Sequence, residues 1–122
     1  YLELKFLDHF TGRASTTAPS AVYLGLAVGS IADNAGGTEL SGSNYSRKAI
    51  TFAVASGGAI SSNASVEFDP ATGSWGTVAY WGIWDASTSG NLLFHGAFTA
   101  SKAIASGDIL KVASGSLTIS AD

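Results

Sequence analysis

The alternation of apolar and polar positions is clearest in Trp75–Thr99, where two β-type segments flank a polar loop. Trp75–Trp84 is rich in Trp, Tyr, Val, Ile and Thr, residue types that favour the half-buried surface of a sheet. Both alternating faces carry bulk, with Trp81 and Ile83 on one and Val78 and Trp84 on the other, which predicts a central strand covered on both sides. The loop at 85–91 holds turn-forming residues, and 92–99 is predicted to return as the second strand. We expect this hairpin to supply much of the core, since each aromatic side chain can bury ~150–250 Å².

The other apolar segments are short and are separated by turns that contain glycine or proline. They predict further strands at Ala21–Val28, Arg47–Val54, Ala64–Phe68, Asp108–Val112 and Ser116–Ser120. Seven or eight short strands of this kind predict an all-β fold, with one domain over residues 1–122 in which residues 21–120 form a β-sandwich or jelly roll. The apolar residues expected to face the core are Tyr23, Phe52, Phe68, Val78, Trp81, Ile83 and Leu93.

A short helix is predicted at Tyr1–Phe10, because Leu2, Phe6 and Phe10 are spaced four apart and Gly12 follows as a stop signal. A helix this short is marginal alone, so it must pack on something. Two interpretations are open: it closes one end of the sheet, or it is an arm that docks onto a neighbouring subunit. Because the sequence begins at Tyr1 and contains no methionine, we expect further residues to precede it.

Gly29–Tyr45 is a long loop that exceeds the usual ~4–6 residues of a connection, and long loops are often functional or interfacial. Asp33, Asn34 and Glu39 lie within it and are oxygen ligands that calcium would accept. Their spacing does not match a known calcium loop, so a solvated loop is preferred and no metal site is predicted.

Composition narrows the class of partner. The net charge of −3 with only six Lys and Arg argues against nucleic acid, which needs a basic footprint. Charged residues are 12% of the chain, about half the usual ~25%, which suits a protein packed against others, although a neutral soluble domain is the alternative. No apolar run reaches the ~18–20 residues of a membrane span. The chain lacks cysteine, so no disulfide or thiolate site is expected.

Motifs for catalysis are missing from the sequence. His9 and His95 do not fall in a metal-binding spacing and are interpreted as structural or surface residues. The sequence has no G-x-S-x-G elbow, phosphate-binding loop or dinucleotide fingerprint, and no pair of carboxylates stands out as in a glycoside hydrolase. The prediction is therefore a protein that is not an enzyme and has no catalytic residues, no cofactor and no small-molecule ligand.

Several segments together carry a resemblance to a known family. The most specific are G-G-T-E-L-S-G-x-x-Y-x-R at Gly36–Arg47 and W-G-T-V-x-x-W-G-I-W-D at Trp75–Asp85. With the segments around them, they resemble a family of small tailed-phage and prophage virion proteins, often labelled as tail-fibre or phage structural proteins. The resemblance covers nearly the whole chain and implies a non-enzymatic virion component.

Two placements on the virion are open under this resemblance. The preferred one is a capsid decoration or cement protein on the head surface, made in the bacterial cytoplasm, with the major capsid protein and a second or third copy of itself as partners. The chain's shortness and the absence of a shaft-like repeat favour it. The alternative is a tail-fibre or tail-tip module whose exposed hairpin aromatics would stack on host sugars. The residues expected to contact other subunits come from the helix and the long loop: Leu2, Phe6, Phe10, Asn34, Glu39, Tyr45 and Arg47.

Overall fold

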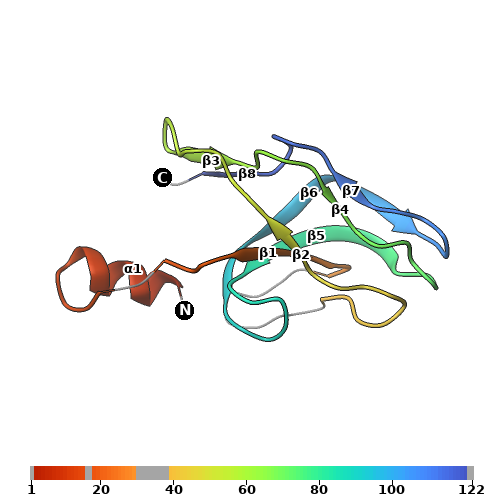
Figure 1. The fold of residues 1–122 in the computed structure, drawn as a ribbon, viewed down its shortest axis with the longest axis horizontal. Coiled ribbons are helices and arrows are strands. Elements are labelled where there is room, and N and C mark those ends of the chain that lie inside the picture. Colours follow the sequence, from red (N-terminus) through yellow and green to blue (C-terminus); the bar gives the residue numbers. More distant parts are fainter. Residues whose placement is uncertain (1, 16–17, 30–38, 121–122) are drawn as a thin grey trace.

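The computed structural model describes residues 2–15, 18–29 and 39–120, which form one helix followed by eight strands (Figure 1). The elements are α1 (Leu2–Phe10), β1 (Val22–Ala27), β2 (Lys48–Ile50), β3 (Ala59–Ser61), β4 (Val66–Glu67), β5 (Gly76–Trp84), β6 (Leu92–Ile104), β7 (Lys111–Val112) and β8 (Thr118–Ser120). The all-β class predicted from the sequence is confirmed.

The main sheet has four antiparallel strands in the order β2-β1-β5-β6. β5 lies between β1 and β6, and its last four residues, 81–84, are all buried. The prediction of a central strand covered on both faces is therefore confirmed.

A second layer, made of the antiparallel pairs β3–β8 and β4–β7, lies over one face of this sheet (Figure 1). The apolar core fills the space between the two layers. Its largest fully buried side chains are Phe68, Leu24, Leu26, Ile83, Ile104 and Val78.

The register of β5 with β6 changes twice, and the two changes alter which side chains face the core. The first lies between Val78 and Tyr80, and it places Val78 in the same buried cluster as Trp81 and Ile83. Strict alternation had put Val78 on the opposite face, so that assignment is wrong. In the second, Ile83 pairs with Phe94 but Trp84 pairs with Leu92, which leaves Leu93 as an extra, bulged residue.

Four of the seven expected core residues are buried: Phe68, Val78, Trp81 and Ile83. The other three, Tyr23, Phe52 and Leu93, are only half-buried. The prediction that Leu93 faces the core is wrong. Because of the bulge, its neighbour Leu92 is the buried residue, and it packs in the second buried cluster beside Trp84 and Ala27.

Two strand boundaries also differ from expectation. β3 was predicted as part of a turn, yet it pairs with β8, nearly sixty residues later in the chain. β6 runs on to Ile104, beyond the segment 92–99 that was predicted as the second strand of the hairpin.

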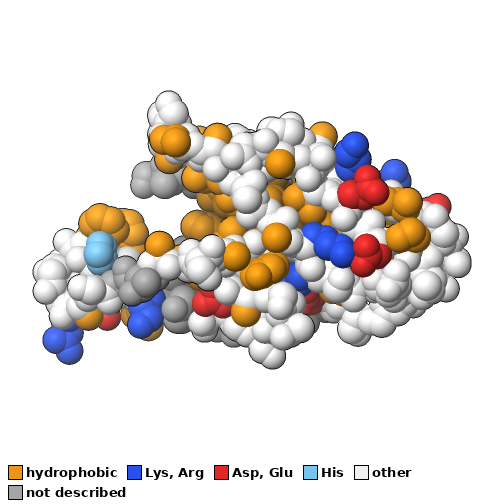
Figure 2. Space-filling model, viewed as in Figure 1, with side chains coloured by type: hydrophobic (Ala, Val, Ile, Leu, Met, Phe, Trp, Pro, Cys, Tyr) orange, Lys and Arg blue, Asp and Glu red, His pale blue; other side chains and the backbone are white. Residues whose placement is uncertain are grey.

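α1 confirms the predicted helix, and Gly12 confirms its predicted end. Gly12 has φ of 77°, and the Arg13 amide donates to the Asp8 carbonyl at 2.9 Å, as in a left-handed helix cap. Figure 1 shows α1 to one side of the strands rather than across the end of the core. Its apolar side chains are 55–72% exposed (Figure 2): Leu4, Phe6, Leu7 and Phe10. None of the described helices is long and apolar enough to cross a membrane.

Candidate functional site

An ion pair between Arg47 and Glu39 lies on the face of the main sheet away from the second layer. Arg47 Nε donates to Glu39 Oε2 and Arg47 Nη2 to Glu39 Oε1, both at 2.8 Å. The side chains are only 8% and 17% exposed. This bidentate geometry matches the planar guanidinium to the carboxylate and fixes both side chains. We call Glu39, Tyr45, Arg47 and Trp84 the arginine cluster.

Tyr45 joins the arginine cluster to the core. Its hydroxyl donates to Glu39 Oε2 at 2.7 Å and accepts from the Leu26 amide at 2.9 Å. Its ring stacks on Phe68, with centroids 6.1 Å apart, and meets Trp75 edge-on. Burial, reinforced by the hydrogen bond to the Glu39 carboxylate, raises the pKa of Tyr45 far above its ordinary value. The phenol is therefore held neutral and does not serve as an acid or a base near pH 7.

Arg47 also binds the loop between β5 and β6. Its guanidinium carbon lies 4.1 Å from the centroid of the Trp84 ring, and Nη1 donates to the carbonyls of Ala86 and Ser89 at 3.0 and 2.7 Å. Gly25 makes this packing possible: a Cβ there would lie 2.6 Å from the Trp84 ring and 2.8 Å from Glu39 Oε2. One side chain thus fastens the 39–47 segment, the end of β5 and the following loop together.

The loop itself is closed by Asp85 and Asn91. Asp85 Oδ1 accepts from the Asn91 amide at 2.7 Å, and Oδ2 accepts from Asn91 Nδ2 at 3.0 Å. These hydrogen bonds stabilise the carboxylate and lower the pKa of Asp85. The loop and the 39–47 segment together line a groove of about 300 Å³, and most of its lining residues have polar side chains: Glu39, Leu40, Ser41, Gly42, Tyr45, Ser46, Arg47, Ser87, Thr88 and Ser89.

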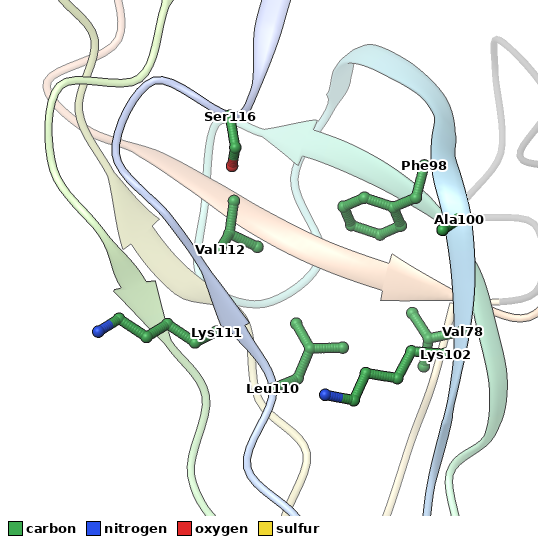
Figure 3. A pocket seen from close by; sticks show the side chains of 8 residues that line it. All are labelled: Val78, Phe98, Ala100, Lys102, Leu110, Lys111, Val112 and Ser116. Carbon is green, nitrogen blue, oxygen red and sulfur yellow. The ribbon is translucent and has the colours of Figure 1, made fainter.

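A second concave site, the lysine-rimmed pocket, opens between β6 and β7 (Figure 3). It has a volume of about 160 Å³. Its wall is mostly apolar; the lining residues are Val78, Phe98, Ala100, Lys102, Leu110, Lys111, Val112 and Ser116. In Figure 3 the apolar side chains surround a common space with Lys102 at its border, whereas the side chain of Lys111 points away from that space.

The structure separates the predicted contact residues into two groups. Glu39, Tyr45 and Arg47 come together in the arginine cluster, where they bind one another. Phe6 and Phe10 are exposed on α1. Asn34 lies outside the described residues, as does the side chain of Leu2.

The hairpin tryptophans do not form the exposed sugar-stacking surface expected for a host-binding module. Trp75, Trp81 and Trp84 are 5%, 8% and 2% exposed, respectively, so the expectation is wrong for the tryptophans, whereas Phe94 of the same hairpin is 37% exposed. The strand pairing of β5 places them in the two buried clusters.

Among the described residues, no group of three or more His, Asp and Glu side chains could hold a metal ion. The carboxylate of Glu39, considered as a calcium ligand, is taken up by Arg47 and Tyr45. Asp33, its proposed companion, lies outside the described residues.

Sequence reasoning missed the lysine-rimmed pocket. Its walls come from three strands, β5, β6 and β7, and the end of β6 lies beyond the strand predicted at 92–99. The alternation of Phe98, Ala100 and Lys102 was the signal available, since these residues share one face of an extended strand.

Comparison with known proteins identifies the family. The family model described as "Podophage GP4 fiber I protein gp80" matches residues 1–120, so the chain belongs to that family. A search of curated proteins found no match. The family is one of phage virion structural proteins, in line with the resemblance seen in the sequence.

Proposed function

We propose that this chain is a non-enzymatic subunit of a podophage fibre and that α1 is the element by which it packs onto a neighbouring subunit. The family match over residues 1–120, with its fibre description, carries the first part of the proposal. It also gives the fibre interpretation priority over the capsid decoration role that we preferred from the sequence.

The exposure of α1 supports the second part. Nine residues are too few for a helix to be stable in water by itself, and tertiary packing normally supplies the missing stability. Here the large apolar side chains of α1 face outward. The rings of Phe6 and Phe10 lie together, with centroids 4.9 Å apart, and an exposed apolar patch of this kind is typical of a protein–protein contact.

The β-domain would act as a rigid body carried by this contact. The arginine cluster ties the loop between β5 and β6 to the main sheet, so the groove that this loop lines has a fixed shape.

Copy number in purified particles tests the placement. A fibre subunit should be present in a handful to a few tens of copies, whereas a decoration protein must occupy every equivalent capsid position and reach on the order of hundreds. Quantitative mass spectrometry against the major capsid protein measures this ratio. A ratio far below about one in ten supports the fibre, and a ratio near one would overturn it in favour of a decoration protein bound to the major capsid protein.

A further inference from the structure

Two apolar surfaces of this chain have complementary chemistry. α1 presents exposed phenylalanines, and the lysine-rimmed pocket presents an apolar hollow. We propose that the two bind each other between copies: Phe10 on α1 of one copy inserts its ring into the lysine-rimmed pocket of a second copy. The inference rests on the proposed role of α1 as a contact element and names what α1 contacts.

The size of the pocket suits one aromatic ring. Its volume is about 160 Å³, and its wall is formed by Val78, Phe98, Leu110 and Val112. Apolar cavities of ~150 Å³ are known to take up a benzene molecule. Phe10 is 72% exposed, and Phe6 packs against it with ring centroids 4.9 Å apart, which leaves Phe6 to cover the border of the site. An aromatic anchor in a fitted pocket is the usual centre of binding energy at an interface.

Charge complements shape. The helical segment 2–10 contains two acidic residues against one lysine, while Lys102 lies at the pocket border and the side chain of Lys111 points away from the pocket (Figure 3). Lys111 lies opposite Glu67 in the β4–β7 pair, so Lys102 supplies the more distinctive positive charge. Complementary charge at the border of an apolar contact orients the partners and favours their encounter.

The arrangement of the molecule favours contact between copies over contact within one. In Figure 1 α1 lies on the side of the domain away from β7, which forms one wall of the pocket. A second copy presents its helix without rearranging the chain that receives it. Such a head-to-tail contact uses different surfaces on the two partners and builds rings or filaments, the assemblies from which fibres are made.

Direct pairing of two α1 helices explains the helix less well. Leu4 and Phe6 project about 160° apart around the axis of a 3.6-residue helix, yet both are exposed. A two-helix seam needs one narrow apolar stripe, whereas apolar groups on both sides suit a helix enclosed by a larger surface. The nine-residue length also falls short of a stable coiled coil.

Two single variants of the whole chain test the proposal in sedimentation velocity or light scattering. Phe10→Ser removes the anchor, and Ala100→Phe fills the pocket from its own exposed wall. We expect the parent chain to associate beyond its 12.3 kDa monomer and each variant to bind itself at least about thirtyfold more weakly. Val54→Ser, at an apolar residue that is 93% exposed and outside both surfaces, is the control and should associate like the parent. Circular dichroism checks that each variant is folded.

Mixing the two variants gives the decisive result. The Phe10→Ser chain keeps an open pocket and the Ala100→Phe chain keeps an intact helix, so an equimolar mixture should form a 1:1 dimer although neither associates alone. Association of Ala100→Phe chains like the parent would show that the helix binds elsewhere and would overturn the proposal. A parent chain that stays monomeric, or a mixture that does, would overturn it too. These outcomes use purified chain and do not depend on the copy number that tests the fibre role.

Discussion

Arg47 contacts three separate segments of the chain at once. Its guanidinium makes two hydrogen bonds to Glu39, two to carbonyls of the loop after β5, and a stacking contact with Trp84. A lysine ammonium has similar charge but no planar fork and cannot make this set of contacts together. The neighbouring Lys48 also forms an ion pair, with Asp69 at 2.8 Å, but on a more exposed surface.

Substitution of these two adjacent residues should therefore have very different effects. Arg47→Ala removes the ion-pair partner of the largely buried Glu39 carboxylate, which keeps only the hydrogen bond from Tyr45, and should lower the free energy of unfolding by about 3–5 kcal/mol. Lys48→Ala should cost less than about 1 kcal/mol, as is usual for an exposed pair. Arg47→Lys should fall between them, because charge is kept but geometry is lost. Urea denaturation measures all three, and equal effects for Arg47→Ala and Lys48→Ala would contradict the role given to the arginine cluster.

Tyr45 predicts a loss of stability in alkaline solution. Its pKa is raised in the folded state, so the folded chain holds the phenol neutral while the unfolded phenol ionises near pH ~10. The stability that this contributes is complete below about pH 10 and is lost as pH rises above it. Tyr45→Phe should cost about 1–2 kcal/mol at neutral pH, through the lost hydrogen bonds. The difference between parent and variant should then shrink above about pH 10. Unfolding free energies across this range that fall in parallel for the two chains would refute the prediction.

At the scale of elements, the sequence predicts those whose causes are local. The spacing of apolar residues and the Gly12 cap predict α1, and the two bulky faces of Trp75–Trp84 predict the central strand. β3 is hidden because its pairing partner, β8, is distant in the chain and only tertiary contact makes Ala59–Ser61 a strand. The bulge at Leu93 could not be predicted for a related reason, since it depends on how two strands pair. It makes Leu92 the buried residue in place of Leu93.

Trp81 on β5 offers the clearest test of the element-level assignment. The indole is 8% exposed, and it packs so closely on β6 that a Cβ at Gly96 would lie 2.7 Å from it. Trp81→Ala should therefore cost about 3–5 kcal/mol. Phe94→Ala on β6 removes a large ring that is 37% exposed and should cost clearly less. Thermal or urea unfolding compares them, and a Trp81→Ala transition indistinguishable from the parent would show that the hairpin is not the centre of the fold.

At the scale of the whole molecule, the sequence predicted some residues of the candidate site but not the contacts that they make within the chain. Glu39, Tyr45 and Arg47 were singled out as contacts with other subunits because they lie in a long loop and a distinctive motif. The structure shows that their polar groups bind within the chain, which a single sequence does not reveal, since the partner residues are far apart along it. The lysine-rimmed pocket could not be predicted because three strands must assemble before it exists.

The division between α1 and the β-domain leads to a prediction about truncation. None of the described side chains of α1 belongs to either buried cluster, and its large apolar residues that are described are exposed, so the isolated domain gains little from them. Deleting residues 2–10 should change the free energy of unfolding by less than about 1 kcal/mol, since surface changes away from packed features usually have small effects.

A truncation at the other end is the matched control. Deleting residues 117–122 removes Leu117, which is 3% exposed, together with the β8 strand that pairs with β3. That change opens the second layer, because a large buried aliphatic side chain and the hydrogen bonds between β3 and β8 are lost together. It should lower the free energy of unfolding by more than about 3 kcal/mol or prevent folding. Urea unfolding of both truncations decides the matter. A loss above about 2 kcal/mol on removal of α1 would show that the helix packs on its own domain in solution and so is not available for a neighbouring subunit.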